Sequence, residues 1–464
     1  MSQLTADCLH EIFEHLKDMD IRSCLLVNSR WCEVSVRFIW KHIQNYHTLI
    51  ACLSNESKEI FSKENIILSS QNPNPPLFNY GMFIQNIEFN DFAKRIKYHI
   101  LEVNDHKIVI VMEEIVKMLM NQISLKTLVF NQCSYSLGGH YFSYLPLERY
   151  PRAMDFFKNL SELDCCTNIH SGLFLKLSKW CHDVQTLKIS FTTNNLSKEF
   201  SDLISIQQNL KCLKIKCCGK MDTSSITQHF NKFHNTLIKL DLNVGRNQLP
   251  ISFVAKFTNL QELILSCDNM MRFHNLDDIV FPTLRTLKFT DKCPRDGHLC
   301  KFIENNGKNL KELHLNDNNN LANFTIAGSC PKLKSLRTDI WGKEIENLSV
   351  IKAILHSCQQ LERLEVKCSR REDHVDEEIL LEYVVDNSPG NFHKLIIRFE
   401  NQSKIFSGSP ENLDSIFTKW ENRIRRIPLS LILHGSHLKI KEDNMKVLEK
   451  FKKLNVIKTF KIDN

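Results

Sequence analysis

Glycine and proline are scarce in this chain, with 13 and 12 residues among 464. The low glycine content argues against glycine-rich phosphate-binding loops, and the scarcity of both residues argues against a chain of short β-hairpins. A chain of this length is too long for one compact core, so it must form several domains or one extended solenoid. We therefore expect helices and regular repeats.

Motifs of catalysis are also missing. The sequence has no Gly-x-Ser-x-Gly, no Gly-x-x-x-x-Gly-Lys and no His-Glu-x-x-His, so no nucleophile elbow, phosphate loop or zinc-protease helix is indicated. His10-Glu11-Ile12-Phe13-Glu14-His15 matches neither orientation of a zinc helix. We expect no enzyme activity and no cofactor.

The 17 cysteines are an odd number, and none of them forms a Cys-x-x-Cys pair. Neither a disulfide framework nor a zinc site follows from this spacing, and the adjacent pairs Cys165-Cys166 and Cys217-Cys218 lack further convergent ligands. We expect no metal. Reduced, mostly buried thiols are typical of a protein in the cytoplasm, the nucleus or both.

Long apolar runs and concentrated charge are lacking as well. No window reaches the roughly 18 apolar residues of a membrane span, and the N-terminus has no secretory pattern. A formal charge of +7 is a mild excess, which makes a dedicated nucleic-acid binder an unfavoured alternative. We expect no membrane partner.

The first 43 residues contain three short helical patterns. Thr5 is placed to cap the first helix, Asp20 to cap a second, and Asn28 or Ser29 to start a third. Two tryptophans, two phenylalanines and many aliphatic residues exceed what so small a unit can bury, so a partner surface is indicated.

This segment resembles the F-box family, whose pattern runs from Leu-Pro through an aliphatic Glu-Ile-aromatic helix to a Cys-Leu-x-Val segment and a final tryptophan. The corresponding residues here are Leu4, Cys8-Leu9-His10-Glu11-Ile12-Phe13-Glu14-His15-Leu16, Asp18-Met19-Asp20, Cys24-Leu25-Leu26-Val27, Trp31 and Trp40-Lys41-His42-Ile43. Thr5 replaces the usual proline. The resemblance implies docking on a Skp-type adaptor, which binds a cullin-RING complex. The apolar anchors that we predict for this docking are Leu4, Leu9, Ile12, Phe13, Leu16, Leu25, Val27, Trp31 and Trp40, although some of them must hold the helices together.

Residues 44–80 are predicted to be a linker or irregular connection, because residues 69–76 form a polar, proline-rich run. From residue 81 to 464 the pattern apolar-x-x-apolar-x-apolar recurs, with central intervals of 23 to 28 residues. The first positions of these units are Ile84, Leu125, Leu160, Val184, Leu210, Leu237, Leu260, Leu284, Leu310, Leu333, Leu361, Phe392, Ile424 and Ile457. Helical spacing between them, as over residues 108–120, completes the alternation of a leucine-rich repeat. The predicted fold class is thus α/β, a leucine-rich-repeat solenoid (horseshoe) preceded by a small all-α three-helix F-box module.

Cysteines recur at fixed repeat positions. Cys181, Cys330 and Cys358 each lie three residues before the first apolar position of a unit, while Cys133, Cys218, Cys267 and Cys368 follow the strand motif. This arrangement resembles the cysteine-containing repeat subtype found with F-boxes. A small, weakly polar side chain is expected to suit the tight interior corner of each coil.

Side chains that flank the two inner apolar positions of a repeat strand should face the concave surface. In the last five units these positions are mostly basic, with Asp339, Glu365 and Asp463 as the exceptions. The residues that we predict to bind an acidic or phosphorylated protein target are Arg337, Arg363, Lys367, Lys394, Arg398 and Arg426. Lys461 belongs to the same set of positions.

These features predict a substrate-recognition subunit of an SCF-type cullin-RING ubiquitin ligase, in which the F-box binds the adaptor and the repeats bind the target. The alternative is a leucine-rich-repeat scaffold outside any ligase. The sequence does not name the target, since repeat surfaces specify partners by details that no motif encodes.

Overall fold

The structure is a computed structural model of the whole chain. It describes residues 4–68, 76–89, 92–101, 104–130, 145–169, 171–192, 196–220, 222, 227–247, 251–267, 276–294, 296–316, 319–340, 344–368, 377–399, 408–423, 427–435 and 440–463. The chain divides into two compact units, Met1–Cys218 and Gly219–Asn464. Each is described by itself.

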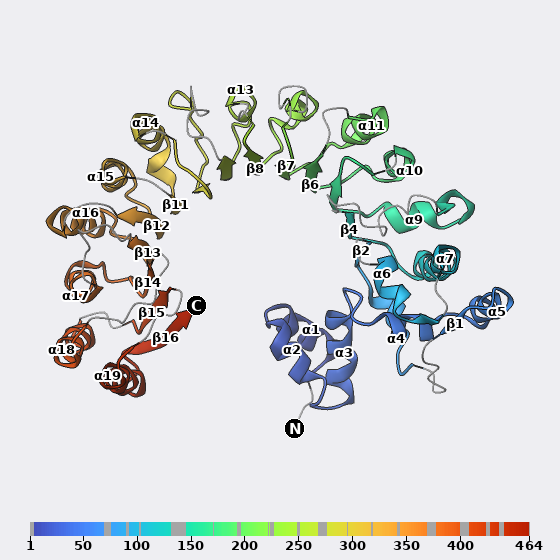
Figure 1. Cartoon of the computed structure of the whole chain (residues 1–464), viewed down its shortest axis with the longest axis horizontal. Coiled ribbons are helices and arrows are strands. Elements are labelled where there is room, and N and C mark those ends of the chain that lie inside the picture. Colours follow the sequence, from blue (N-terminus) through green and yellow to red (C-terminus); the bar gives the residue numbers. More distant parts are fainter. Residues whose placement is uncertain are drawn as a thin grey trace. The chain divides into compact units, whose positions relative to one another are not determined.

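Unit 1 begins with three helices and continues as alternating strands and helices (Figure 1). Its helices are α1 (Ala6–Glu14), α2 (Asp18–Cys24), α3 (Ser29–Ile39), α4 (Tyr46–Ala51), α5 (Asn55–Lys63), η1 (Tyr80–Phe83), α6 (Phe92–Lys97), α7 (Asp105–Gln122), η2 (Leu147–Arg149), α9 (Ala153–Phe157), α10 (Ser171–Trp180) and α11 (Lys198–Ile206). Its strands are β1 (Ile67–Leu68), β2 (Asn86–Glu88), β3 (Ile100–Leu101), β4 (Thr127–Phe130), β5 (Glu162–Cys166), β6 (Thr186–Phe191) and β7 (Cys212–Cys217).

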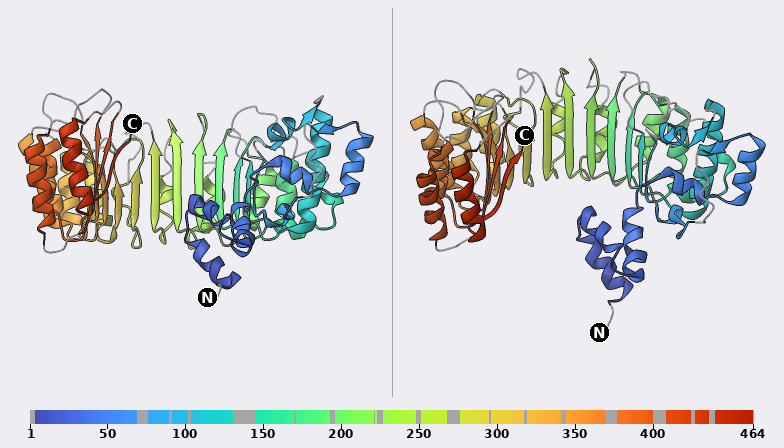
Figure 2. Two further views of the ribbon diagram at one scale, coloured as in Figure 1. Left: turned by 90° about the horizontal axis from the view of Figure 1, so that it is seen from below. Right: turned by 60° about the horizontal axis from the view of Figure 1, so that its bottom comes forward.

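Unit 2 consists of further strand and helix pairs, whose strands lie side by side in Figure 2. Its strands are β8 (Lys239–Gly245), β9 (Glu262–Cys267), β10 (Thr286–Phe289), β11 (Glu312–His314), β12 (Ser335–Ile340), β13 (Arg363–Cys368), β14 (Lys394–Phe399), β15 (Leu429–His434) and β16 (Ile457–Asp463). Its helices are η3 (Gln228–Phe233), α13 (Ile251–Val254), α14 (Asp296–Asn306), η5 (Gly307–Asn309), α15 (Asn320–Ser329), α16 (Glu344–Ser357), α17 (Glu377–Asn387), α18 (Pro410–Glu421) and α19 (Glu442–Lys453).

Within each unit the repeat strands form a parallel sheet in the order of the sequence. In unit 1 the order is β2-β4-β5-β6-β7, and β1 pairs with β3 in a separate antiparallel pair. In unit 2 the order runs from β8 to β16 without exchange. One strand per repeat and a returning helix on the same face of the sheet make up the predicted solenoid, so the predicted fold class is confirmed.

The leucines that define the repeat motif stack in register. Leu336 pairs with Leu364, Leu364 with Leu395, and Leu395 with Leu431, and each is at most 2% exposed. Buried leucine ladders of this kind account for the regular period, since each coil covers the apolar residues of the next. The helical pattern at residues 108–120 is confirmed as part of α7.

Backbone hydrogen bonds also join neighbouring repeats where the strands begin. In many of the repeats two successive N–H groups donate to one carbonyl of the preceding repeat, as Glu362 and Arg363 do to the carbonyl of Lys334, at 2.8 and 3.0 Å. This arrangement fixes the register of neighbouring coils before the strand proper begins.

Two sequence predictions are corrected by the structure. Residues 46–63 form α4 and α5 rather than an irregular connection, because Asn45 and Ser54 cap the two helices and Leu49 and Phe61 bury their apolar faces. Residues 69–75 of the proline-rich run lie outside the described residues.

The second correction concerns the repeat assigned to start at Ile424. Its strand, β15, begins at Leu429, and its register with β14 pairs Leu431 with Leu395. The first apolar position therefore falls on Pro428, four residues later than predicted. The motif was not recognised in the sequence because a proline occupies the position where the repeats usually have an aliphatic residue. Arg426, predicted to bind the target, lies outside the described residues.

The three cysteines that precede the motif occupy the buried corners that the repeat positions predict, and Cys267 is buried as well, whereas Cys218 is exposed. Cys181, Cys330 and Cys358 are at most 1% exposed. The thiol of Cys181 donates to the carbonyl of Phe157, and that of Cys358 to the carbonyl of Cys330, at 3.5 Å in each case. These thiols link successive coils as weak donors. Cys133 lies outside the described residues.

Candidate functional site

The N-terminal module consists of three short helices, of which the first and third have side-chain caps. Thr5 accepts a hydrogen bond from the backbone N–H of Cys8 at 3.3 Å, and Asn28 accepts one from that of Trp31 at 3.0 Å. Both caps agree with the sequence prediction, since a side-chain oxygen before a helix satisfies an otherwise unpaired N–H. The second helix begins at Asp18, two residues earlier than the predicted cap at Asp20, and it has no side-chain cap.

A small core holds these helices together. Leu9, Phe13, Cys24 and Val34 are buried, and Leu16, Trp31 and Phe38 pack against them. The ring of Phe13 meets those of Trp31 and Phe38 edge-on, at centroid distances of 5.4 and 6.0 Å. Edge-to-face packing of aromatic rings adds to the stabilisation from burial alone.

The structure sorts the predicted adaptor anchors by exposure. Leu9 and Phe13 are 0% exposed, so the prediction that they contact an adaptor is wrong for the folded module, where they form its core. Leu16, Leu25 and Trp31 are half-buried. Three predicted anchors remain well exposed, namely Leu4 (46%), Ile12 (41%) and Val27 (55%).

Two further exposed apolar residues were missed by the sequence analysis. Met19 in α2 is 75% exposed and Leu26, in the turn after α2, is 89% exposed. The sequence signal that could have found Met19 is an apolar side chain between two aspartates, and for Leu26 it is the middle position of the apolar run Leu25-Leu26-Val27. We name Leu4, Ile12, Met19, Leu26 and Val27 the exposed apolar set. Several exposed apolar side chains on so small a module indicate an interaction site.

Trp40 has a different role from the one predicted. It is 8% exposed, and its ring lies 4.4 Å from that of Tyr80 in η1, centroid to centroid. Directly after it, the carbonyl of Lys41 accepts hydrogen bonds from the N–H groups of Gln85 and Asn86, each at 2.9 Å. His42 pairs with Asn86 as an isolated parallel bridge. Trp40 therefore belongs to the junction between the module and the first repeat.

In unit 2, the predicted target-binding residues gather on three adjacent strands. Arg337 lies on β12, Arg363 and Lys367 on β13, and Lys394 and Arg398 on β14. The described helices of this unit lie on the opposite face of the sheet, as Figure 1 shows. Register pairs Arg363 with Lys394 and Lys367 with Arg398, so the structure brings these cations together.

Two nearly buried carboxylates lie among these cations. Glu365, 1% exposed, accepts a hydrogen bond from Arg363 at 2.6 Å and forms ion pairs with Arg398 and, at 3.5 Å, with Arg337. Asp339, also 1% exposed, lies 4.0 Å from Lys367. These two carboxylates pair with several of the cations, so a count of basic residues along the sequence overstates the unpaired positive charge.

The F-box domain family matches residues 1–42. This chain carries an F-box domain. Parallel strand and helix repeats, which begin at β2, follow it after α4, α5 and η1, so the chain is an F-box protein with leucine-rich repeats. No curated protein matches the chain.

Among solved structures, the chain is similar to a leucine-rich repeat-containing protein of Legionella pneumophila at 13% identity and a TM-score of 0.35, covering 65% of this chain and 93% of that one. A leucine-rich-repeat protein of Leptospira interrogans is similar at 14% identity and a TM-score of 0.35, covering 85% of this chain and 100% of that one.

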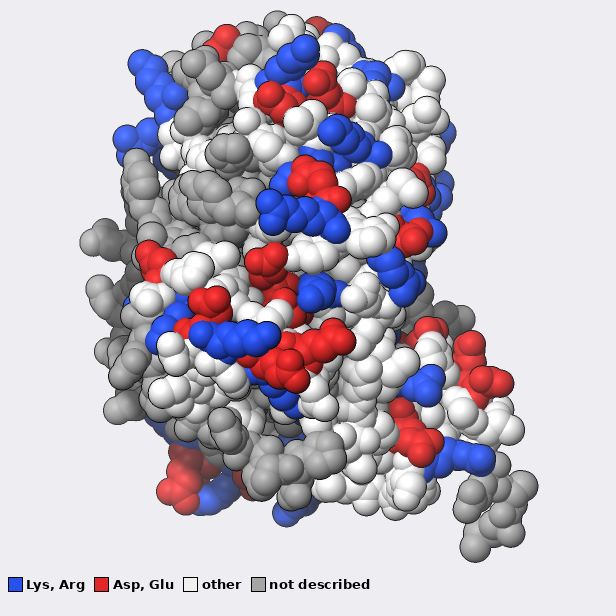
Figure 3. Space-filling view, turned by 90° about the vertical axis from the view of Figure 1, so that its right-hand side faces the viewer, with Lys and Arg blue, Asp and Glu red and all other residues white. Residues whose placement is uncertain are grey.

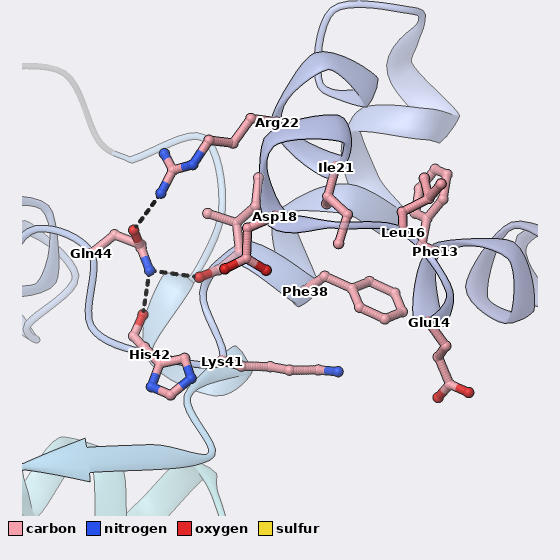
Figure 4. A pocket seen from close by; sticks show the side chains of 11 residues that line it. Phe13, Glu14, Leu16, Asp18, Ile21, Arg22, Phe38, Lys41, His42 and Gln44 are labelled. Atoms are coloured by element: carbon pink, nitrogen blue, oxygen red, sulfur yellow. Dashed lines mark hydrogen bonds between the residues drawn. The ribbon is translucent and has the colours of Figure 1, made fainter. Parts of the chain in front are cut away.

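The F-box domain also contains a cleft of about 460 Å³ beside its junction with the first repeat (Figure 4). Gln44 closes one end, accepting a hydrogen bond from Arg22 at 3.0 Å and donating to the carbonyl of Ile39 at 2.9 Å. The ammonium of Lys41 lies 4.2 Å from the centre of the Phe38 ring. The lining residues are Phe13, Glu14, Leu16, Asp18, Ile21, Arg22, Phe38, Ile39, Lys41, His42 and Gln44. An apolar wall with a charged rim suits an amphipathic side chain of a partner.

Other kinds of site find little support in the described parts of this F-box protein. The His, Cys, Asp and Glu side chains of those parts include no group of three placed to hold a metal ion. No described helix combines the length and apolarity of a membrane span. Basic and acidic side chains alternate on the face drawn in Figure 3, where no extended basic stripe is seen.

Proposed function

We propose that this F-box protein is the substrate-recognition subunit of an SCF-type cullin-RING ubiquitin ligase, acting in the cytoplasm, the nucleus or both. Its F-box domain binds a Skp-type adaptor, and its repeats hold the target protein. The chain performs no chemistry in this proposal. It raises the effective concentration of the target's lysine near the activated ubiquitin that the rest of the complex supplies.

The observation that carries the proposal is the F-box domain at residues 1–42 together with its exposed apolar set. Leu26 and Met19 are 89% and 75% exposed although the domain has an apolar core in which to bury such side chains. Full burial of one aliphatic side chain is worth roughly 1.5–3 kcal/mol. A partner that covers the set would gain several such contributions.

The junction at Trp40 supports the positional part of the proposal. The paired hydrogen bonds to the carbonyl of Lys41 and the packing of Trp40 on Tyr80 attach the F-box domain to the first repeat through backbone as well as side-chain contacts. A receptor gains effective concentration only when the link between its two binding sites is short or rigid.

The test is co-purification of the full chain with a Skp-type adaptor. Ile12→Asp and Leu26→Asp place a charge on exposed positions, so they should abolish adaptor binding while leaving the fold intact. The matched control is Leu175→Asp, because Leu175 is an apolar residue of α10 that is 43% exposed, close to the 41% of Ile12.

Loss of binding in both F-box variants with the control unaffected would support the ligase role. An adaptor that fails to bind the unaltered chain would instead favour the non-ligase scaffold. Cells that lack the adaptor then provide a second readout, because the ligase proposal requires the proteins captured by the repeats to accumulate there.

A further inference from the structure

Glu365 organises three arginines from three neighbouring strands. Nη2 of Arg363 donates to Oε2 of the carboxylate at 2.6 Å, while the Nε atoms of Arg337 and Arg398 approach Oε1. The carboxylate is 1% exposed, whereas the arginine side chains are 29% to 36% exposed. The anion therefore lies beneath the cations, and an incoming ligand meets the guanidinium groups first.

Glu365 alone does not satisfy these arginines. One carboxylate offers about four lone-pair positions, but three guanidinium groups carry about fifteen N–H donors. Arg337 and Arg398 use Nε toward Glu365, so their terminal nitrogens are not required for that ion pair. Held guanidinium groups of this kind match the oxygens of a phosphate, which they bind in a bidentate manner.

Mutual repulsion among the arginines supports the same conclusion. Burial is the largest cause that lowers the pKa of Arg337 from its usual value, followed by the charge of Arg398; Glu365 and Asp339 act against it, and the charge of Arg363 adds a smaller repulsion. The group stays charged at neutral pH, since an arginine pKa lies far above it. A second anion would relieve this repulsion.

Two lysines extend the cluster on the same strands. Lys394 is the register neighbour of Arg363, and Lys367 is that of Arg398. Among the described residues, Lys394 has no carboxylate partner. Neighbouring strands lie about 4.8 Å apart and alternate residues about 6.6 Å apart along each strand. All five cations thus lie within the reach of one or two phosphate groups.

The basic cluster has a limit on the side of the earlier repeats. There Glu262 pairs with Lys239 at 2.8 Å, and Glu312 pairs with Lys288 at 3.1 Å. Each of these lysines is therefore neutralised by a carboxylate on the neighbouring strand. A nucleic-acid backbone requires a long basic track, whereas a compact cluster suits an isolated phosphate group on a protein.

We infer that Arg337, Arg363 and Arg398, held by Glu365 and flanked by Lys367 and Lys394, form a binding site for a phosphoserine or phosphothreonine in an acidic segment of a partner protein. Calling that partner a ubiquitination target rests on the proposed function. The inference that the site binds the phosphorylated segment does not rest on the proposed function.

The experiment uses the purified full chain and two fluorescent peptide pools, identical except that the central residue is phosphoserine in one and serine in the other. We expect the phosphoserine pool to bind at least tenfold more tightly. Inorganic phosphate should displace it. Lys394→Glu should lower the affinity about tenfold without loss of the fold, because the variant breaks no ion pair of the described residues.

The matched control is Lys216→Glu. Lys216 is an exposed lysine of β7, a repeat strand outside the cluster, so its variant makes the same change of charge as Lys394→Glu. The Lys216→Glu variant should bind the phosphoserine pool within twofold of the affinity of the unaltered chain. Adaptor co-purification is measured on the same preparations and should be the same for all three proteins, so a failed ligase proposal and a failed phosphate site give different results.

Equal binding of the two pools would overturn the inference. So would equal losses from Lys394→Glu and Lys216→Glu, which would indicate general charge attraction. A single-stranded RNA that displaces the phosphoserine pool at lower concentration than the unlabelled phosphopeptides would assign the cluster to nucleic acid and overturn it as well.

Discussion

The carbonyl oxygen of Lys41 accepts a hydrogen bond from the backbone N–H of Asn86 at 2.9 Å, as well as one from its neighbour Gln85. The same pair of bonds recurs between successive repeats, where Lys126 and Thr127 donate to the carbonyl of Gln85. The last residues of the F-box domain thus take the place of a preceding repeat. They pair with Asn86, the first residue of β2, whose backbone N–H would otherwise lack this acceptor.

Trp40→Ala should loosen this junction. Removal of a buried tryptophan typically costs about 3–5 kcal/mol of unfolding free energy, and here the contact with Tyr80 is lost as well. Denaturant unfolding of the full chain provides the measurement. Leu77→Ala, at a site 81% exposed, is the control and should change the free energy of unfolding by less than about 0.5 kcal/mol. Similar values for the two variants would contradict the proposed role of Trp40.

Leu9→Ala and Leu26→Ala should have opposite consequences. Leu9 is 0% exposed and Leu26 is 89% exposed. The first substitution should therefore lower the unfolding free energy by about 2–5 kcal/mol, because it leaves a cavity. The second should leave stability nearly unchanged but weaken adaptor binding about tenfold, as expected for an interface anchor. Calorimetric titration beside thermal unfolding distinguishes them, and an adaptor affinity unaffected by Leu26→Ala would remove it from the docking surface.

Thr5→Ala should destabilise the first helix. Loss of a threonine N-cap costs about 1 kcal/mol, since the N–H of Cys8 loses its acceptor. Unfolding of the full chain measures the change. Thr5→Ser keeps the hydroxyl oxygen and should restore most of the stability. If serine is no better than alanine, the cap contributes nothing.

Glu365→Gln should make stability less dependent on pH in acid. Burial alone would raise the pKa of Glu365, but the hydrogen bond from Arg363 and the charges of Arg398 and Arg337 outweigh burial and hold the pKa below its usual value of 4.5. Between the lowered folded pKa and the unfolded pKa, only the unfolded state binds the proton, so stability rises with pH there. Glu365 thus contributes its full stabilisation above about pH 4.5, and this is lost as pH falls through the folded pKa.

The measurement is the unfolding free energy of both proteins from pH 6 down to the lowest pH at which they stay folded. The unaltered chain should lose more stability than Glu365→Gln below about pH 4.5. Parallel curves would show that the carboxylate of Glu365 is not held by the arginines.

The corner cysteines should resist alkylation in the native protein. Burial raises the pKa of Cys181 to about 12 and that of Cys358 to about 12, so hardly any reactive thiolate forms near neutral pH. Cys8 and Cys218 are exposed and should react with iodoacetamide before the corner cysteines. Mass spectrometry of peptides after timed alkylation provides the readout. Early modification of Cys358 without unfolding would contradict the buried corner position.

Much of the fold follows from local patterns in the sequence. The spacing of Leu336, Leu364 and Leu395 predicted strands that stack in register, because a solenoid repeats the same contacts in every coil. The pattern failed at Pro428, where an atypical residue occupies a regular position, and at α4 and α5, which form helices without belonging to a strand motif. Only the tertiary contacts of the folded chain show that Pro428 occupies a repeat position and that α4 and α5 are packed helices.

The candidate sites depended more on tertiary contacts. An F-box order of residues predicted a docking module, and helical spacing marked Leu9 and Ile12 alike, yet one is 0% and the other 41% exposed. In so small a module, the packing of α1 on α3 decides which edge of an apolar stripe is covered. That choice is not encoded in the spacing.

The sequence by itself determined the repeat period, the F-box pattern and the excess of basic residues in the last units. All three depend only on residue type and on the order of residues close together in the chain. Only the tertiary structure decided that Trp40 joins the domain to the repeats and that Glu365 lies beneath arginines from three strands. Residues 28 to 33 positions apart meet there because parallel pairing places successive coils side by side, and cross-strand neighbours are fixed by register rather than by distance along the chain.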